Sequence, residues 1–142
     1  MTTLTSPTKI LAGVWHNQHN SEMHLEIDET GKIVGSFVNG ISKDGGRSET
    51  FPLTGFVRND VFSFCVDFSK YGCMTAWVGQ VVDPANQRFV ASWQMIADAY
   101  QNEKLIWKST WIGQDTFESG PRKSEVSNDR SPASHPLFCG II

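Results

Sequence analysis

The sequence predicts an all-β fold, an eight-stranded antiparallel up-and-down β-barrel, and two observations support this prediction. Apolar and polar residues alternate with a period of two from residue 13 to residue 117, as in half-buried strands. Clusters of Gly, Pro, Asn and Asp interrupt the alternation at short intervals, as expected for turns. No segment has a clear helical period, and 142 residues suffice for one domain with a substantial core.

Eight segments carry the strand pattern. In order along the chain they are residues 14–18, 22–28, 33–39, 51–57, 61–68, 74–81, 88–96 and 106–117. The second segment is the clearest, because Met23, Leu25 and Ile27 alternate with charged and polar residues. Connections this short require antiparallel neighbours. Closing the strands into a barrel removes exposed sheet edges and encloses space for one small ligand.

The chain divides into three parts, of which the barrel is the largest. Residues 1–12 form an N-terminal segment and residues 13–117 the predicted barrel. Residues 118–142 form a tail that is rich in Ser, Pro and charged residues and is expected to be flexible. The tail nevertheless ends in an apolar patch, and such an end commonly docks on a protein surface.

Composition argues against several classes of partner. Lys plus Arg number 12 against 15 Asp plus Glu, which gives no electrostatic reason to expect nucleic acid or an acidic membrane surface. No apolar run reaches the roughly 18 residues that span a bilayer. Residues 1–10 lack the apolar core of a signal peptide, so we expect a cytoplasmic protein or a secreted one whose signal has been removed.

Polar side chains share one face of the predicted strands with large rings. Residues i and i+2 of a strand point the same way, which pairs each polar residue with a neighbouring ring. The pairs are Asn17 with Trp15, Asn39 with Phe37, Thr75 with Trp77, and Asp115 with Phe117, while Trp93 pairs with Met95. Each buried polar group costs about 1–3 kcal/mol if it is left unpaired. Any one of them could bond backbone instead, but their shared face favours a pocket for a polar ligand.

Four short motifs lie along the predicted barrel: GVWHNQ at 13–18, TAWVGQ at 75–80, SWQM at 92–95 and WKSTWIGQDTF at 107–117. In this order and spacing they resemble strands of the avidin/streptavidin family of biotin-binding proteins. The resemblance covers residues 13–117 and implies a barrel that binds biotin with high affinity. It also implies that the protein is not an enzyme and that biotin is its ligand rather than a cofactor.

The resemblance assigns a polar contact to each end of the biotin bicycle. Asn17 and Ser21 would donate hydrogen bonds to the ureido oxygen. Asp115 would accept one from a ureido N–H, and Asn39 would serve the other. Thr75 would contact the thioether sulfur.

The resemblance also implies an apolar wall and a contact between subunits. Phe68, Trp77 and Trp93 would line the bicyclic ring, with Met95 on the same face as Trp93. Trp107 matches a tryptophan that caps the pocket of a neighbouring subunit. This match implies a homotetramer, although the family also contains homodimers.

Three positions depart from the family pattern and predict weaker binding than in its tightest members. Phe37 stands where a Tyr usually donates to the ureido oxygen. Phe68 replaces the more common Trp. Cys73 stands where a Ser usually reaches the valerate carboxylate, and a thiol is a weak donor. One lost hydrogen bond costs about 1–1.5 kcal/mol, on the order of tenfold in affinity.

The three cysteines and the histidines leave alternatives open. Cys65 and Cys73 flank a short connection, so they could form a disulfide, and reduced buried thiols are the alternative. The cysteines lack metal-ligand spacing, and no cysteine or carboxylate cluster supports a metal site at His16, His19 and His24. No metal site is therefore predicted.

Two further alternatives concern the ligand and the tail. A lipocalin-like carrier of another small ligand or a peptide-binding barrel would share the fold, but the polar residues of the inner face argue against a purely apolar cargo. One hypothesis is that Pro136, Leu137 and Phe138 of the tail dock in the biotin pocket of their own or a neighbouring subunit. A disordered tail or a contact between subunits is the alternative.

Overall fold

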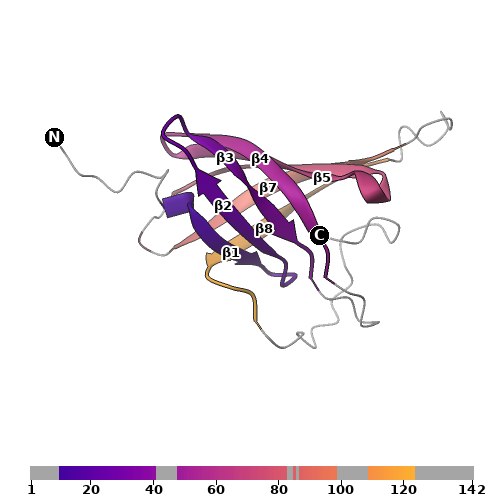
Figure 1. Ribbon diagram of the computed structural model, residues 1–142, viewed down its shortest axis with the longest axis horizontal. Coiled ribbons are helices and arrows are strands. Elements are labelled where there is room, and N and C mark those ends of the chain that lie inside the picture. Colours follow the sequence, from indigo (N-terminus) through magenta and orange to yellow (C-terminus); the bar gives the residue numbers. More distant parts are fainter. Residues whose placement is uncertain (1–9, 41–47, 83–84, 86, 99–108, 124–142) are drawn as a thin grey trace.

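The computed structural model describes residues 10–40, 48–82, 85, 87–98 and 109–123. It consists almost entirely of eight β-strands, which confirms the predicted fold class (Figure 1). The strands are β1 Gly13–Asn17, β2 Glu22–Ile27, β3 Lys32–Val38, β4 Thr50–Arg58, β5 Val61–Phe68, β6 Cys73–Gln80, β7 Arg88–Ala97 and β8 Thr110–Ser119. In the part of the chain described here, no helix is long and apolar enough to span a bilayer.

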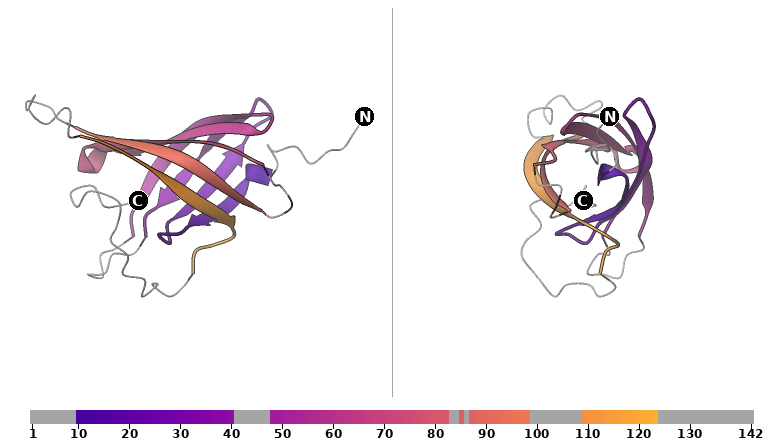
Figure 2. Two further views of the ribbon diagram at one scale, coloured as in Figure 1. Left: turned by 180° about the vertical axis from the view of Figure 1, so that it is seen from behind. Right: turned by 90° about the vertical axis from the view of Figure 1, so that its left-hand side faces the viewer.

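Each strand pairs antiparallel with the next one along the chain, and β8 pairs with β1 to close the barrel. The end-on view in Figure 2 shows the resulting ring of strands. β8 continues to Ser119, two residues beyond the predicted end, because Trp15 and His16 pair with Ser119 and Glu118. Sequence alone does not reveal this extension, since it depends on the partner strand rather than on local alternation.

One short helical turn, which the sequence pattern did not predict, connects β5 to β6. It is the 3-10 turn η1, Ser69–Tyr71. Gly72 ends the turn in the left-handed conformation, with φ of 70°, which residues other than glycine adopt at a cost. The turn is too short to produce a helical period in the sequence.

The strands alternate between a buried and an exposed face, as the period of two predicts. β4 follows this rule at every position: Phe51, Leu53 and Val57 are buried, whereas Phe56 between them is 58% exposed. Inward rings and aliphatic side chains from all eight strands form one core. Burial of this apolar surface is the main source of stability for such a barrel.

One end of the barrel is filled by aromatic rings. Phe89 lies at the centre of this cluster, with ring centroids 4.7 Å from Trp15, 4.9 Å from Phe62 and 5.0 Å from Phe117. The indole N–H of Trp15 donates to the carbonyl of Leu11, 2.8 Å away, so the segment before β1 also closes this end. The closed end leaves the opposite end of the barrel for a ligand.

Candidate functional site

The candidate site lies at the other end of the barrel. In an up-and-down barrel the ends of the odd strands and the starts of the even strands meet at one rim. That rim carries the predicted residues Asn17, Ser21, Phe37, Asn39, Phe68 and Cys73, which come from β1, β3, β5, β6 and the connections between strands. Thr75, Trp77, Trp93, Met95 and Asp115 lie deeper, along β6, β7 and β8.

The Asp115 carboxylate is the centre of the buried polar groups. The residue is 1% exposed, and its Oδ2 accepts the indole N–H of Trp77 at 2.9 Å and the amide of Asn17 at 3.4 Å. Its Oδ1 accepts the side-chain amide of Gln18 at 2.8 Å. Donors from two other strands and a turn therefore compensate for burial of this carboxylate.

The turn between β1 and β2 fixes the orientation of the Asn17 amide. Asn17 Oδ1 accepts the backbone N–H groups of His19, at 3.1 Å, and Ser21, at 2.9 Å. This arrangement is typical of Asn in tight turns. With its oxygen used in this way, the side chain directs its Nδ2 donor toward Asp115.

The Ser21 hydroxyl is buried beside this turn. It is 1% exposed, and its oxygen accepts the backbone N–H of Gly40 at 3.0 Å. The hydroxyl thus joins the β1–β2 turn to the chain that leaves β3. Because the oxygen serves as the acceptor in this bond, the hydroxyl proton is available for a further acceptor.

The Thr75 hydroxyl is buried without a partner. The residue is 0% exposed, and its Oγ1 has no hydrogen-bond partner among the described residues. An unpaired buried hydroxyl costs about 1–3 kcal/mol. A group of this kind is a candidate for contact with a ligand.

Aromatic rings surround these polar groups. The Phe37 ring lies 5.7 Å from Phe68 and 5.4 Å from Trp77, measured between centroids, and all three side chains are fully buried. Trp93 is the register partner of Trp77 across β6 and β7. A Cβ atom at Gly113 would lie 2.4 Å from the Trp93 ring. The indole can therefore pack against the backbone of β8 only because residue 113 has no side chain.

Met95 and Asn39 occupy different environments, although both were predicted to contact the ligand. Met95 is fully buried and is the register partner of Thr75. Asn39 is half-buried, and its Oδ1 accepts the backbone N–H of Glu49 at 2.5 Å. The Asn39 side chain therefore closes the base of the β3–β4 connection. Trp107, the last predicted contact, lies outside the described residues.

Gln18 and His19 are also neighbours of Asp115, which the sequence did not predict. Gln18 bridges β1 and β8, because its Nε2 donates to Asp115 and its Oε1 accepts the backbone N–H of Thr116 at 2.9 Å. His19 Nε2 lies 4.0 Å from Asp115 Oδ1. Both residues belong to the turn after β1, where the rule of alternating faces no longer applies. Only the GVWHNQ motif, which contains Gln18, marked this region.

Comparison with known proteins identifies the family. The model of the avidin family matches residues 6–120 of this sequence. The chain belongs to the avidin family. Its membership confirms the resemblance that the four sequence motifs predicted.

Solved structures of avidin-family proteins have the same fold. Xenavidin superposes with a TM-score of 0.66 at 23% identity, over 78% of this chain and 97% of that one. The rhizavidin–biotin complex gives a TM-score of 0.63 at 27% identity, covering 80% and 95% of the two chains. A shwanavidin variant in complex with biotin gives 0.61 at 21% identity, covering 75% and 95%.

The cysteines of this avidin-family chain differ from both alternatives considered from the sequence. The Cys65–Cys73 disulfide, which the sequence left open, does not form, because Cys65 carries a free thiol. Cys73 is nevertheless disulfide-bonded, so it is not a reduced thiol either. A disulfide sulfur has no S–H, and the weak donor expected at Cys73 is therefore missing. Burial, aided by the Asp67 carboxylate, raises the pKa of the Cys65 thiol and keeps it protonated.

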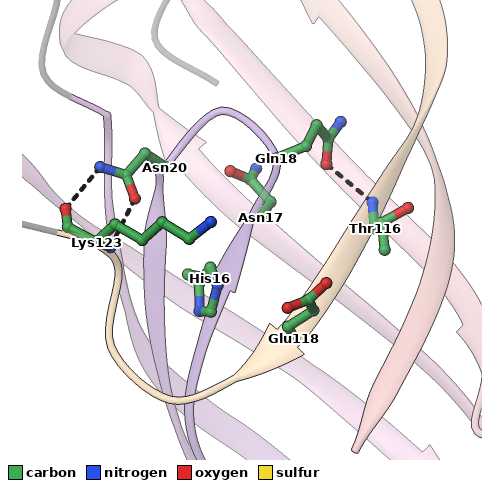
Figure 3. A pocket seen from close by; sticks show the side chains of 7 residues that line it. All are labelled: His16, Asn17, Gln18, Asn20, Thr116, Glu118 and Lys123. Atoms are coloured by element: carbon green, nitrogen blue, oxygen red, sulfur yellow. Dashed lines mark hydrogen bonds between the residues drawn. The ribbon is translucent and has the colours of Figure 1, made fainter. Parts of the chain in front are cut away.

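A polar pocket of about 290 Å³ borders the predicted site where β1 and β8 meet, and Asn17 is one of its lining residues (Figure 3). His16 and Glu118, register partners on the two strands, line it together with Thr116 and Lys123. His16 Nδ1 donates to the carbonyl of Gly120 at 3.0 Å. The described residues contain no group of three or more His, Cys, Asp or Glu side chains placed to hold a metal ion.

Proposed function

We propose that this avidin-family protein binds biotin, without catalysis, in the open end of its barrel. The observation that carries the proposal is the buried polar set: the Asp115 carboxylate, the Asn17 amide and the unpartnered Thr75 hydroxyl inside a wall of rings. Biotin offers a complementary pattern, a polar ureido group and a thioether on a compact apolar bicycle. The rhizavidin and shwanavidin structures with this fold contain biotin.

The polar residues match the ureido group in hydrogen-bonding sense. Asp115 would accept a ureido N–H, a charge-assisted bond stronger than one between neutral groups. Asn17 Nδ2 and the Ser21 hydroxyl would donate to the ureido oxygen, and Asn39 would serve the second N–H. Thr75 would gain in the thioether sulfur the partner that it lacks among the described residues.

The walls would enclose the bicycle with little reorganisation. Phe68, Trp77 and Trp93 would pack against it, Met95 would fill the space beside Thr75, and Trp107 would cover a neighbouring pocket. Trp77 is already fixed by its bond to Asp115, and Gly113 leaves Trp93 its space. A pocket formed in advance loses little conformational entropy on binding, which favours high affinity.

The same geometry favours binding over catalysis. A hydroxyl nucleophile requires a base within hydrogen-bonding reach. The Thr75 hydroxyl has no hydrogen-bond partner among the described residues and so no such base. A buried carboxylate that accepts three side-chain donors likewise argues against a lipocalin-like carrier of purely apolar cargo.

We predict that Asp115→Asn weakens biotin binding by about 10- to 100-fold, because a hydrogen bond to a charged group contributes about 1.5–3 kcal/mol. Isothermal titration calorimetry with biotin, supported by the quenching of tryptophan fluorescence, measures the change. Glu118→Gln, an exposed residue on the same strand, is the control and should leave the affinity unchanged. An unaltered dissociation constant for Asp115→Asn, or no binding by the natural sequence, would contradict the proposal.

We further propose that biotin binds less tightly here than in the tightest family members. Phe37 is fully buried among the rings, so it offers packing where a Tyr would add a donor. Cys73, held in a disulfide, offers no S–H to the valerate carboxylate. Phe68 is smaller than the usual Trp and covers less of the bicycle.

We predict that Phe37→Tyr strengthens biotin binding by roughly tenfold, because the phenol restores a donor to the ureido oxygen. The dissociation rate of fluorescently labelled biotin should fall correspondingly. Phe89→Tyr is the control, since it buries the same hydroxyl in the ring cluster of the closed end. Equal or weaker binding by Phe37→Tyr would show that the missing donor does not limit affinity.

We also propose that the protein self-associates as a homodimer or homotetramer. The outer faces of β6, β7 and β8 carry exposed apolar side chains: Val78 is 59% exposed, Ile96 52% and Ile112 78%. They adjoin a groove of about 560 Å³ that is lined mainly by apolar surface. The outer face of β2 carries His24 and Glu26 instead. Exposed apolar side chains on three neighbouring strands beside an apolar groove are typical of a protein–protein interface.

We predict that Ile112→Asp breaks this association, because a charge in an apolar interface is not compensated. Analytical ultracentrifugation should show the natural sequence as a dimer or tetramer and Ile112→Asp as a smaller species. Val34→Asp, 43% exposed on β3, is the control and should retain the larger mass. A monomeric natural sequence would refute the proposal.

The tail residues Pro136, Leu137 and Phe138 lie outside the described residues, and we propose that they dock at the pocket. Cys73 is disulfide-bonded while Cys65 is free, and the only other cysteine in the sequence is Cys139, directly after Phe138. Cys73 is buried and lies on the inward face with Thr75, at the rim of the barrel. A bond between Cys73 and Cys139 would hold this apolar segment at the entrance to the site.

We predict that truncation after Lys123 speeds biotin association severalfold, because the segment no longer competes for the entrance. Cys139→Ser should have a similar effect, and a reducing agent should accelerate the natural sequence but not the truncated one. Stopped-flow fluorescence measures the association rate. If neither truncation nor Cys139→Ser alters the association rate, the tail does not dock at the pocket.

A further inference from the structure

The chain that follows β8 returns across the β1–β2 turn. The backbone N–H of Gly120 donates to the carbonyl of Val14 at 2.8 Å. Asn20 and Lys123 then form a reciprocal pair: the Lys123 N–H donates to Asn20 Oδ1, and Asn20 Nδ2 donates to the Lys123 carbonyl, both at 2.9 Å (Figure 3). We call residues 120–123 the strap.

The Arg122 side chain joins the two ends of the β3–β4 connection. One guanidinium nitrogen donates to the carbonyl of Asn39 at 2.8 Å, and the other donates to the Ser48 hydroxyl at 2.9 Å. Asn39 directly follows β3, and Ser48 lies two residues before β4. A planar guanidinium can serve two acceptors at once, which the single ammonium of a lysine does less well.

The strap is itself anchored on β2. The backbone N–H of Arg122 donates to Glu22 at 3.0 Å, and His24 contacts the other oxygen of the same carboxylate at 2.8 Å. Partial burial raises the pKa of Glu22, but the bonds and charges of Arg122 and His24 outweigh it, so the pKa lies below its ordinary value. Glu22 is therefore ionised at neutral pH and is a strong acceptor for the strap.

The start of the β3–β4 connection contacts Ser21, one of the proposed hydrogen-bond donors to biotin. Gly40, next to Asn39, donates its backbone N–H to the Ser21 hydroxyl, and Asn39 is paired with Glu49 through both its backbone and its side chain. The position of the Ser21 hydroxyl therefore depends on where the connection leaves β3. Arg122 fixes that point from outside the barrel.

We propose that Arg122 is a positioning residue for ligand binding: by holding the two ends of the β3–β4 connection together, it orders the rim of the pocket before the ligand arrives. Arg122 bonds the backbone carbonyl of Asn39 rather than the proposed ligand, and it acts through Asn39 and Ser48. Ordering a loop in advance removes part of the entropy that binding otherwise loses. The effect on binding kinetics rests on the proposed biotin site, but the hydrogen bonds of Arg122 to Asn39 and Ser48 do not depend on biotin.

Arg122→Ala should speed the dissociation of biotin by about three- to tenfold, the effect of losing one or two hydrogen bonds. Association should change less, because the diffusional encounter does not require the rim to be ordered. Arg122→Lys should restore only part of the loss. Lys123→Ala is the matched control, since the strap contacts of Lys123 use its backbone N–H and carbonyl.

Hydrogen exchange in the ligand-free protein separates this inference from the proposed function. Arg122→Ala should speed exchange at the amides of Gly40 and Glu49, with little change at the amides of β6, and Lys123→Ala should not. Faster exchange in a protein that does not bind biotin would support the ordering role of Arg122 and reject the biotin site. Equal exchange and equal dissociation in Arg122→Ala and Lys123→Ala would overturn the role of Arg122.

Discussion

Closure of β8 against β1 is the constraint on which the site depends. Asn17 and Asp115 are separated by 98 positions in sequence, and only the pairing of the first and last strands brings their side chains together. Gln18 strengthens this closure because it bonds both Asp115 and the backbone of Thr116. The contact that closes the barrel is thus also the one that orients the carboxylate, so the same groups would serve stability and the proposed recognition of the ligand.

Burial of the Asp115 charge shows how the site remains stable without a ligand. An unpaired carboxylate inside a ring-lined barrel would cost several kcal/mol. The Trp77 indole, the Asn17 amide and Gln18 offset that cost in the free protein. These three donors leave part of the acceptor capacity of the carboxylate unused, so a ligand N–H can join them. Thr75, in contrast, has no partner among the described residues and has more to gain from the ligand.

Local alternation predicted all eight strands and the shared inward face of Asn17, Thr75 and Asp115, because period and parity are local properties of a strand. The family motifs added the roles that parity cannot assign. Contacts of Gln18 and Arg122 escaped prediction because both residues lie outside regular strands and reach partners far along the chain. The bonding of Cys73 escaped for the same reason, since pairing between cysteines depends on the fold and not on spacing.

Phe37 and Cys73 depart from the family pattern at the two ends of the proposed ligand. Recognition would therefore depend mainly on contacts with the middle of the ligand. In the proposed complex, Phe37 would give the ureido oxygen one donor fewer, and Cys73 would give the carboxylate tail none from a thiol. What remains is the Asp115 carboxylate and the packing of the bicycle, and both act only while the rim holds the ligand in place. A lost donor weakens binding mainly by speeding dissociation. On this proposal, ordering of the rim by Arg122 would matter more in this protein than in one with a full set of donors.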